Sequence, residues 1–155
     1  MGDPAPRFEL RGIDNQIRSL DEADGPTGTF LFFYSRELKD CRAAFPYMER
    51  LTRLVVKRGG RVWAVTRDGH GESLETADQF QLSFPILLDR RGWVSQAYAV
   101  AALPSFFHLD GELRLVQSVL GWKPDDVRTA ALAFAQTHGM ETDGLFQEGD
   151  WLPGA

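Results

Sequence analysis

Cysteine is almost missing from this 155-residue chain, which contains a single one, Cys41. One cysteine cannot close a disulfide within the chain, and it falls short of the cysteine pairs of a zinc ribbon. The stability of the fold must therefore come from an apolar core. With 43% hydrophobic residues, a chain of this length has enough apolar surface for the core of one domain.

The chain also lacks a run of Lys or Arg and carries a net charge of -5. Binding along a phosphate backbone or an anionic membrane needs clustered positive charge, so we expect neither nucleic acid nor a membrane as a partner. Apolar runs such as residues 97–103 are much shorter than the roughly 20 residues of a membrane span. The first ten residues lack a basic segment followed by an apolar one. We therefore expect a cytoplasmic protein, or a periplasmic one if a signal peptide has been removed.

Strands and helices are predicted to alternate along the first half of the chain. Residues 29–35 and 61–66 are nearly all apolar, which is typical of strands covered on both faces. Apolar residues at spacings of three and four predict a helix over 38–58, and a second helix is expected over 72–82. Pro46 lies inside the first helix and should bend it, because proline has no N–H to donate.

The second half predicts a short strand and helix, then a hairpin and a last helix. The hairpin turn is the dipeptide Asp110-Gly111, a strong local hairpin signal. Residues 123–138 are expected to form the closing helix, with Pro124 in its first turn. The order of elements predicts an α/β fold with a central mixed sheet and helices on both faces. We expect this domain to occupy residues 1–138 and to be followed by a tail, residues 139–155, without periodicity.

The order of these elements and the residues at their joints resemble the thioredoxin superfamily, in particular its TlpA-like and redoxin (AhpC/TSA-type) branch. In that family an aromatic strand leads into a CxxC motif at a helix N-terminus. A basic residue follows the second cysteine, and a proline stands five residues after it. The run FFYSRELKDCRAAFP supplies the strand, Cys41, Arg42 and Pro46 at these positions. Leu38 holds the position of the first cysteine, so the resemblance implies a degenerate CxxC site, Leu38-Lys39-Asp40-Cys41.

A second stretch, DRRGWVSQAYAVAALPSFFHLDGEL, extends the resemblance to the redoxin branch, which has an extra strand and helix after the first helix. Pro104 matches the family's cis-proline, which faces the CxxC site across the groove where a substrate peptide lies. The match covers residues 3–137 and implies a thioredoxin-like fold. It also implies a substrate groove at Pro104, with Leu103 beside it and Arg36 and Glu37 on the opposite side.

The missing first cysteine limits the chemistry that the resemblance implies. Leu38 cannot attack a disulfide, and the second thiol of a CxxC site acts only on a mixed disulfide that the first has formed. We therefore expect dithiol activity to be weak or lost, leaving at most monothiol chemistry at Cys41 with a protein or low-molecular-weight thiol or disulfide. Cys41 is either that thiol or a small core residue. The alternative function is a non-catalytic module that binds a peptide or protein in the groove by Pro104.

Other readings of the same residues have less support. A one-cysteine peroxidase would need Thr or Ser and Pro where the chain has Leu38 and Tyr34. The charged run SRELKD is either a rim that guides a partner or a solvated helix start capped by Ser35. His70 and His108 have no second ligand at a suggestive spacing, so we expect neither a metal nor another cofactor.

Overall fold

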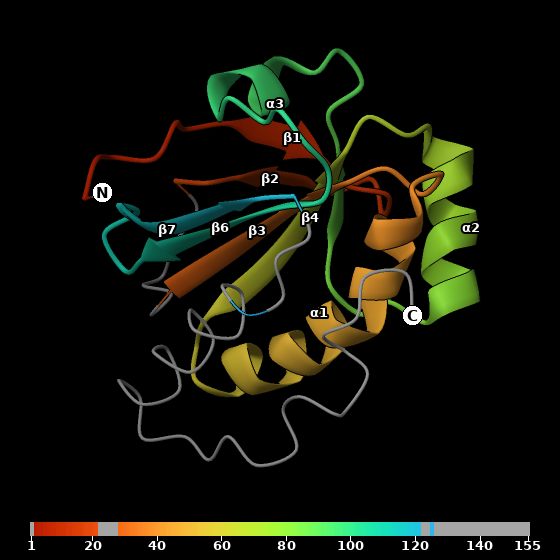
Figure 1. Ribbon diagram of the computed structural model, residues 1–155, viewed down its shortest axis with the longest axis horizontal. Helices are drawn as coiled ribbons and strands as arrows, with labels where there is room; N and C mark the ends of the chain where they lie inside the picture. The colour runs from red at the N-terminus through yellow and green to blue at the C-terminus, as the bar shows by residue number, and fades with distance from the viewer. Residues whose placement is uncertain (1, 22–27, 122–124, 126–155) are drawn as a thin grey trace.

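The computed structural model describes residues 2–21, 28–121 and 125 (Figure 1). Its centre is a five-stranded sheet in the order β5-β4-β3-β6-β7. The strands are β3 (Gly28–Tyr34), β4 (Arg61–Thr66), β5 (Ile86–Leu88), β6 (Ser105–Asp110) and β7 (Leu115–Leu120). β3, β4 and β5 are parallel, β6 pairs antiparallel with β3, and β7 pairs antiparallel with β6. This is the mixed sheet that the sequence pattern predicted.

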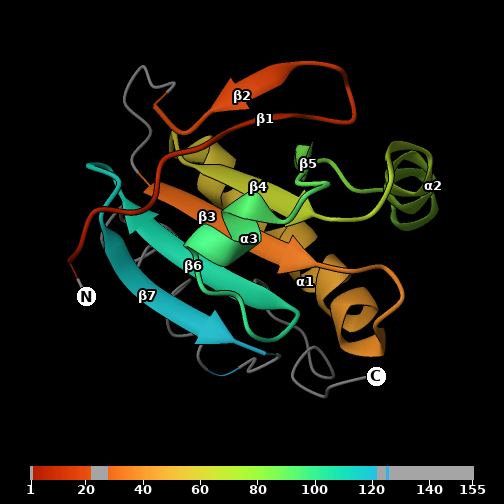
Figure 2. The ribbon, with the colours of Figure 1, turned by 90° about the horizontal axis from the view of Figure 1, so that it is seen from above.

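The sheet is covered on both faces. One face carries α1 (Lys39–Lys57) and α2 (His70–Phe80). The other carries α3 (Trp93–Ala97) and a hairpin of β1 (Glu9–Arg11) and β2 (Ile17–Ser19) (Figure 2). The prediction of helices on both faces is therefore confirmed, and α1 differs from its predicted range by one residue at each end.

β3 is buried along its whole length because both of its faces meet a covering layer. Phe30, Phe32 and Tyr34 belong to the core on the α1 face, whereas Leu31 and Phe33 belong to the core on the hairpin face. This alternation follows from the two-residue period of a strand. Each fully buried side chain of this size stabilises the fold by roughly 1.5–3 kcal/mol. The same strand leads directly into the loop at residues 35–38.

The start of α1 differs from the sequence-based expectation. Its N-cap is Leu38, which makes no side-chain hydrogen bond to the helix end, so Ser35 is not the cap. Pro46 lies within the helix, whose ribbon changes direction along its length (Figure 1). A bend at this place is the expected consequence of a missing N–H in the second turn.

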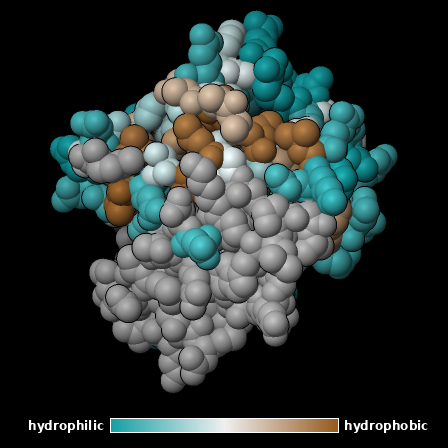
Figure 3. All heavy atoms as spheres, in the orientation of Figure 1, coloured by the Kyte–Doolittle hydropathy of each residue, from teal (hydrophilic) through white to brown (hydrophobic). Residues whose placement is uncertain are grey.

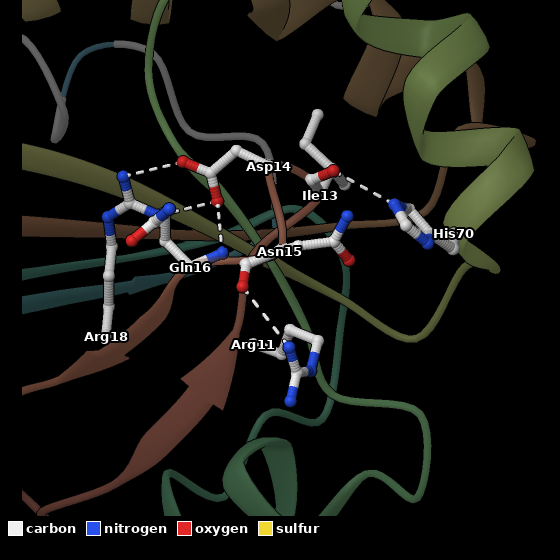
Figure 4. Close-up of polar contacts among 7 residues, drawn as sticks. All are labelled: Arg11, Ile13, Asp14, Asn15, Gln16, Arg18 and His70. Carbon is white, nitrogen blue, oxygen red and sulfur yellow. Dashed lines mark hydrogen bonds and ion pairs between the residues drawn. The ribbon is translucent and has the colours of Figure 1, made fainter.

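The β1–β2 hairpin is fixed at its turn by polar contacts (Figure 4). Asp14 accepts two hydrogen bonds from the Arg18 guanidinium and one from the backbone N–H of Gln16. The ring Nε2 of His70, the first residue of α2, lies 2.9 Å from the carbonyl oxygen of Ile13. This contact joins the hairpin to α2 across the edge of the sheet.

The predicted closing helix, residues 123–138, lies outside the described residues except for Asp125, and so does the predicted boundary between residues 138 and 139. Figure 3 shows the surface of the molecule in the orientation of Figure 1. Among the described residues on this side, a band of apolar side chains lies next to more polar ones. Within residues 2–21 and 28–121, no helix has both the length and the apolar character that a membrane crossing requires.

Candidate functional site

The sheet topology brings together the two segments that are predicted to border a groove. β6 runs beside β3 with Ser105 opposite Phe33, so Leu103 and Pro104 lie next to the end of β3. The peptide bond between Leu103 and Pro104 is cis. Ser35, the first residue after β3, lines a pocket together with Leu103. The loop before α1 and the segment before β6 are therefore neighbours.

Leu38 and Cys41 occupy very different environments although they are three residues apart. Leu38 precedes the first turn of α1 and is 43% exposed, which is high for a large apolar side chain. Cys41 is the third residue of the helix and is 0% exposed. It belongs to the core cluster that includes Ala44 and Phe45. The surface position at the helix start thus carries a leucine, and the thiol lies beneath it.

Burial raises the pKa of Cys41 to about 11. The negative charges of Asp40 and Asp68 act in the same direction. Two contacts oppose them: the backbone N–H of Ser35 donates to Sγ at 3.5 Å, and Arg42 contributes a positive charge. Burial outweighs both, so the thiol is protonated at neutral pH.

Arg36 is held against α2. Its guanidinium Nη1 lies 3.2 Å from the Glu75 carboxylate and donates to the carbonyl of Glu72. Its own carbonyl accepts a hydrogen bond from the Arg42 guanidinium at 2.8 Å. Glu37 is exposed next to it. The charged loop is therefore tied to two helices.

Asp68 supports the loop, a role that the sequence reasoning did not identify. Its Oδ2 accepts a hydrogen bond from the backbone N–H of Arg36 at 2.9 Å. The hydroxyl of Thr66 accepts from the Asp68 N–H and donates to the carbonyl of Tyr34, which connects the ends of β4 and β3. Because neighbouring parallel strands end at the same edge of a sheet, a polar residue two positions after β4 is a signal that could have found it.

The two histidines considered as metal ligands have other contacts. His70 contacts the carbonyl of Ile13, and the His108 ring stacks on Phe30 with ring centroids 4.3 Å apart. Among residues 2–21 and 28–121, no three His, Cys, Asp or Glu side chains form a group that could hold a metal ion.

Comparison with known proteins places this chain in a family. The model of the AhpC/TSA family matches residues 1–118. The thiol-disulfide oxidoreductase ResA of Geobacillus kaustophilus is 34% identical over 122 residues, which cover 78% of this chain and 70% of that protein. ResA of Geobacillus thermodenitrificans is 32% identical with the same coverage.

Solved structures share the fold. The thioredoxin domain of a thiol-disulfide oxidoreductase from Bacteroides vulgatus superposes with a TM-score of 0.75 at 18% identity, covering 86% of this chain and 96% of that domain. Peroxidoxin BcpB from Mycobacterium tuberculosis gives a TM-score of 0.74 at 20% identity, covering 88% of this chain and 96% of that one. The fold is thioredoxin-like, and the chain belongs to the AhpC/TSA family within the redoxin branch of the thioredoxin superfamily.

Proposed function

We propose that this chain is a redoxin that does not cycle a dithiol and instead binds a protein segment in the groove between residues 35–38 and Pro104. One observation carries the proposal. The exposed start of α1, where the family's attacking thiol would stand, is occupied by Leu38, while the single thiol, Cys41, is fully buried. Partner proteins therefore meet a leucine at this place.

The chemistry of thiol–disulfide exchange supports this proposal. The thiolate is the attacking species, and with a pKa of about 11 only about one Cys41 in 10,000 is ionised at pH 7. The sulfur must also approach the disulfide in line, and Cys41 has no exposed surface through which a disulfide could reach it. A reaction at Cys41 would first require the start of α1 to open.

The surface at the groove is suited to binding. Leu38 offers an exposed apolar side chain, and charged neighbours surround it at the exposed positions Glu37 and Lys39. The loop that carries these residues is fixed by the Asp68 and Arg36 contacts. A fixed apolar contact within a polar rim is typical of the centre of a protein-binding surface. We infer that the partner presents an apolar side chain to Leu38.

The Leu38→Cys variant tests the chemical half of the proposal. In an insulin-reduction assay with dithiothreitol, the parent protein should not accelerate reduction, whereas Leu38→Cys should. Val56→Cys is the matched control, because it adds an exposed cysteine to α1 outside the groove. Acceleration by the parent protein would refute the proposal, and equal acceleration by Val56→Cys would show that any added thiol suffices.

Selection of peptides tests the binding half. Peptides enriched from a random short-peptide library on the immobilised protein should bind about tenfold or more weakly to Leu38→Glu, because a charge replaces the central apolar contact. Val56→Glu should bind them as the parent does. Equal affinity for the parent and Leu38→Glu would show that the peptides bind elsewhere.

A monothiol reaction at Cys41, including a one-cysteine peroxidase, is the second candidate. The hydrogen bond from the Ser35 N–H to Sγ favours it, since a donor of this kind stabilises a thiolate. This function requires that iodoacetamide alkylates Cys41 in the folded protein at a rate near that of a free thiol. Alkylation only under unfolding conditions would leave the binding proposal standing.

A further inference from the structure

A pocket of about 480 Å³ opens next to the groove, at the carboxyl ends of β3 and β4. Ser35 and Leu103 belong both to its lining and to the proposed groove, and Val100 and Phe33 add apolar surface. The lining also includes the polar residues Arg67, Asp68, Arg90 and Ser95. Its volume lies within the range of small-molecule sites, which are mostly apolar with a few placed polar groups.

Two arginines line this pocket, one from each of two neighbouring loops. Arg67 follows β4, and Arg90 follows β5. The Arg67 guanidinium packs against Gly92, where a Cβ would lie 2.9 Å from Nε, and Arg90 Nη1 would lie 2.9 Å from a Cβ at Gly69. Arg90 Nη1 also lies 3.4 Å from the carbonyl oxygen of Arg67. Each side chain thus rests on the loop that carries the other, which holds both cations at one pocket.

The two nearby carboxylates accept hydrogen bonds from other groups. Asp68, which itself lines the pocket, accepts the backbone N–H of Arg36 through Oδ2. The buried Asp89 accepts hydrogen bonds from the backbone N–H of Val94 and from both the N–H and the hydroxyl of Ser95. Within the described part of the chain, neither Arg67 nor Arg90 has an ion pair. Two cations at one pocket repel each other, and a bound anion removes that repulsion.

We propose that this pocket binds a small organic anion whose carboxylates contact Arg67 and Arg90 and whose carbon skeleton contacts Val100 and Leu103. Guanidinium groups match the planar, two-oxygen geometry of a carboxylate. The apolar wall favours an organic anion over inorganic phosphate, because phosphate leaves that wall uncovered. This site is separate from the protein-binding function proposed above, and either can fail without the other.

Titration of the ¹⁵N-labelled protein with adipate, a dicarboxylate with an apolar body, tests the proposal. Saturable shifts should appear at residues 67, 90 and 95, whereas the neutral adipamide should cause none. Arg67→Gln and Arg90→Gln should each weaken adipate binding about tenfold or more, because each removes hydrogen bonds to a charged group. Arg91→Gln is the matched control, since its guanidinium lies over the Trp93 ring at 5.2 Å and does not line the pocket.

Three outcomes would overturn the proposal. Adipate binding weakened as much by Arg91→Gln as by Arg67→Gln would mean that only the overall charge matters. If inorganic phosphate bound as tightly as adipate, the apolar wall of Val100 and Leu103 would contribute nothing to binding. Linear, non-saturating shifts up to high adipate concentration would mean that there is no site. In each case the thermal melting of the variants shows that the comparison is made between folded proteins.

Discussion

Alkaline pH should destabilise the folded protein through Cys41, and the size of the effect follows from the burial of its thiol. The ordinary pKa of the group is 9.0, and burial raises it to about 11 in the folded protein. Below pH 9 both states hold the proton, so the contribution of the protonated thiol to stability is fully present. As the pH rises from 9 toward 11, the unfolded chain releases the proton first, and the stability falls. Between pH 9 and pH 11 the free energy of unfolding falls by roughly 2–3 kcal/mol through this group.

Urea unfolding of the parent protein and of Cys41→Ala at two pH values measures this loss. At about pH 8 the parent should be more stable by roughly 1 kcal/mol, since alanine leaves a small void in the core. At about pH 10.5 the parent should have lost about 2 kcal/mol relative to the variant, which reverses their order. The buried Tyr34 and Tyr98 also have raised pKa values, but they are present in both proteins and their effect cancels in the difference.

A stability difference that stays constant between the two pH values would refute the reasoning. It would mean that Cys41 ionises as readily in the folded protein as in the unfolded chain, and the argument against thiol chemistry would lose its basis. Cys41→Ser is a second variant that keeps the side-chain size and has no titration in this range. It should follow Cys41→Ala in its dependence on pH.

Two further predictions concern hydrogen bonds of α1 and of the β1–β2 hairpin. The buried Glu49 carboxylate of α1 accepts hydrogen bonds from the backbone N–H and the hydroxyl of Ser83, so Glu49→Ala should lower the free energy of unfolding by about 1–3 kcal/mol in urea titrations. Glu49→Gln should cost less, and equal losses would contradict the hydrogen-bond explanation. The hydrogen bonds from Arg18 hold the pKa of Asp14 below its usual value of 3.8, so Arg18→Gln should raise the Asp14 pKa in an NMR titration. The contribution of ionised Asp14 to the stability of the fold is present above pH 3.8 and is lost as the pH falls through the lowered pKa. An Asp14 pKa that does not change in Arg18→Gln would contradict the assignment of the shift to Arg18.

The strands and the long helix could be predicted from the sequence because the spacing of their apolar residues shows which positions are buried. The apolar run at β3 and the spacing in α1 each require only neighbouring residues. The start of α2 was harder to predict: the sequence indicated residue 72, and the helix begins at His70. The loop sequence RDGHG contains two glycines, yet His70 and Gly71 are helical, and the Glu72 carboxylate accepts the backbone N–H of Gly69 at 3.3 Å. A cap formed with a glycine has no side-chain signal.

The family resemblance placed Cys41 at the start of the long helix and Pro104 before a strand, and the structure has them in α1 and directly before β6. That they border a substrate groove stays a prediction. Whether Cys41 is a core residue or a reactive thiol remained open, since a helix start can be exposed or covered and only packing decides. Asp68, Arg67 and Arg90 were missed because their loops meet through the parallel pairing of β3, β4 and β5, which is a property of the whole sheet.

The contacts that hold the loop before α1 are independent of any sulfur at its surface. The loop at residues 35–38 is held by the Asp68 carboxylate, by the Arg36 ion pair with Glu75 and by the link from Thr66 to Tyr34. Replacing an exposed side chain at position 38 touches none of these interactions, and exposed substitutions usually change stability by less than about 0.5 kcal/mol. The parent and Leu38→Cys should therefore unfold at nearly the same urea concentration while differing in their reaction with insulin. The proposed function thus separates catalysis from binding: the exposed side chain at position 38 would supply the reaction, whereas the backbone around it would supply the surface.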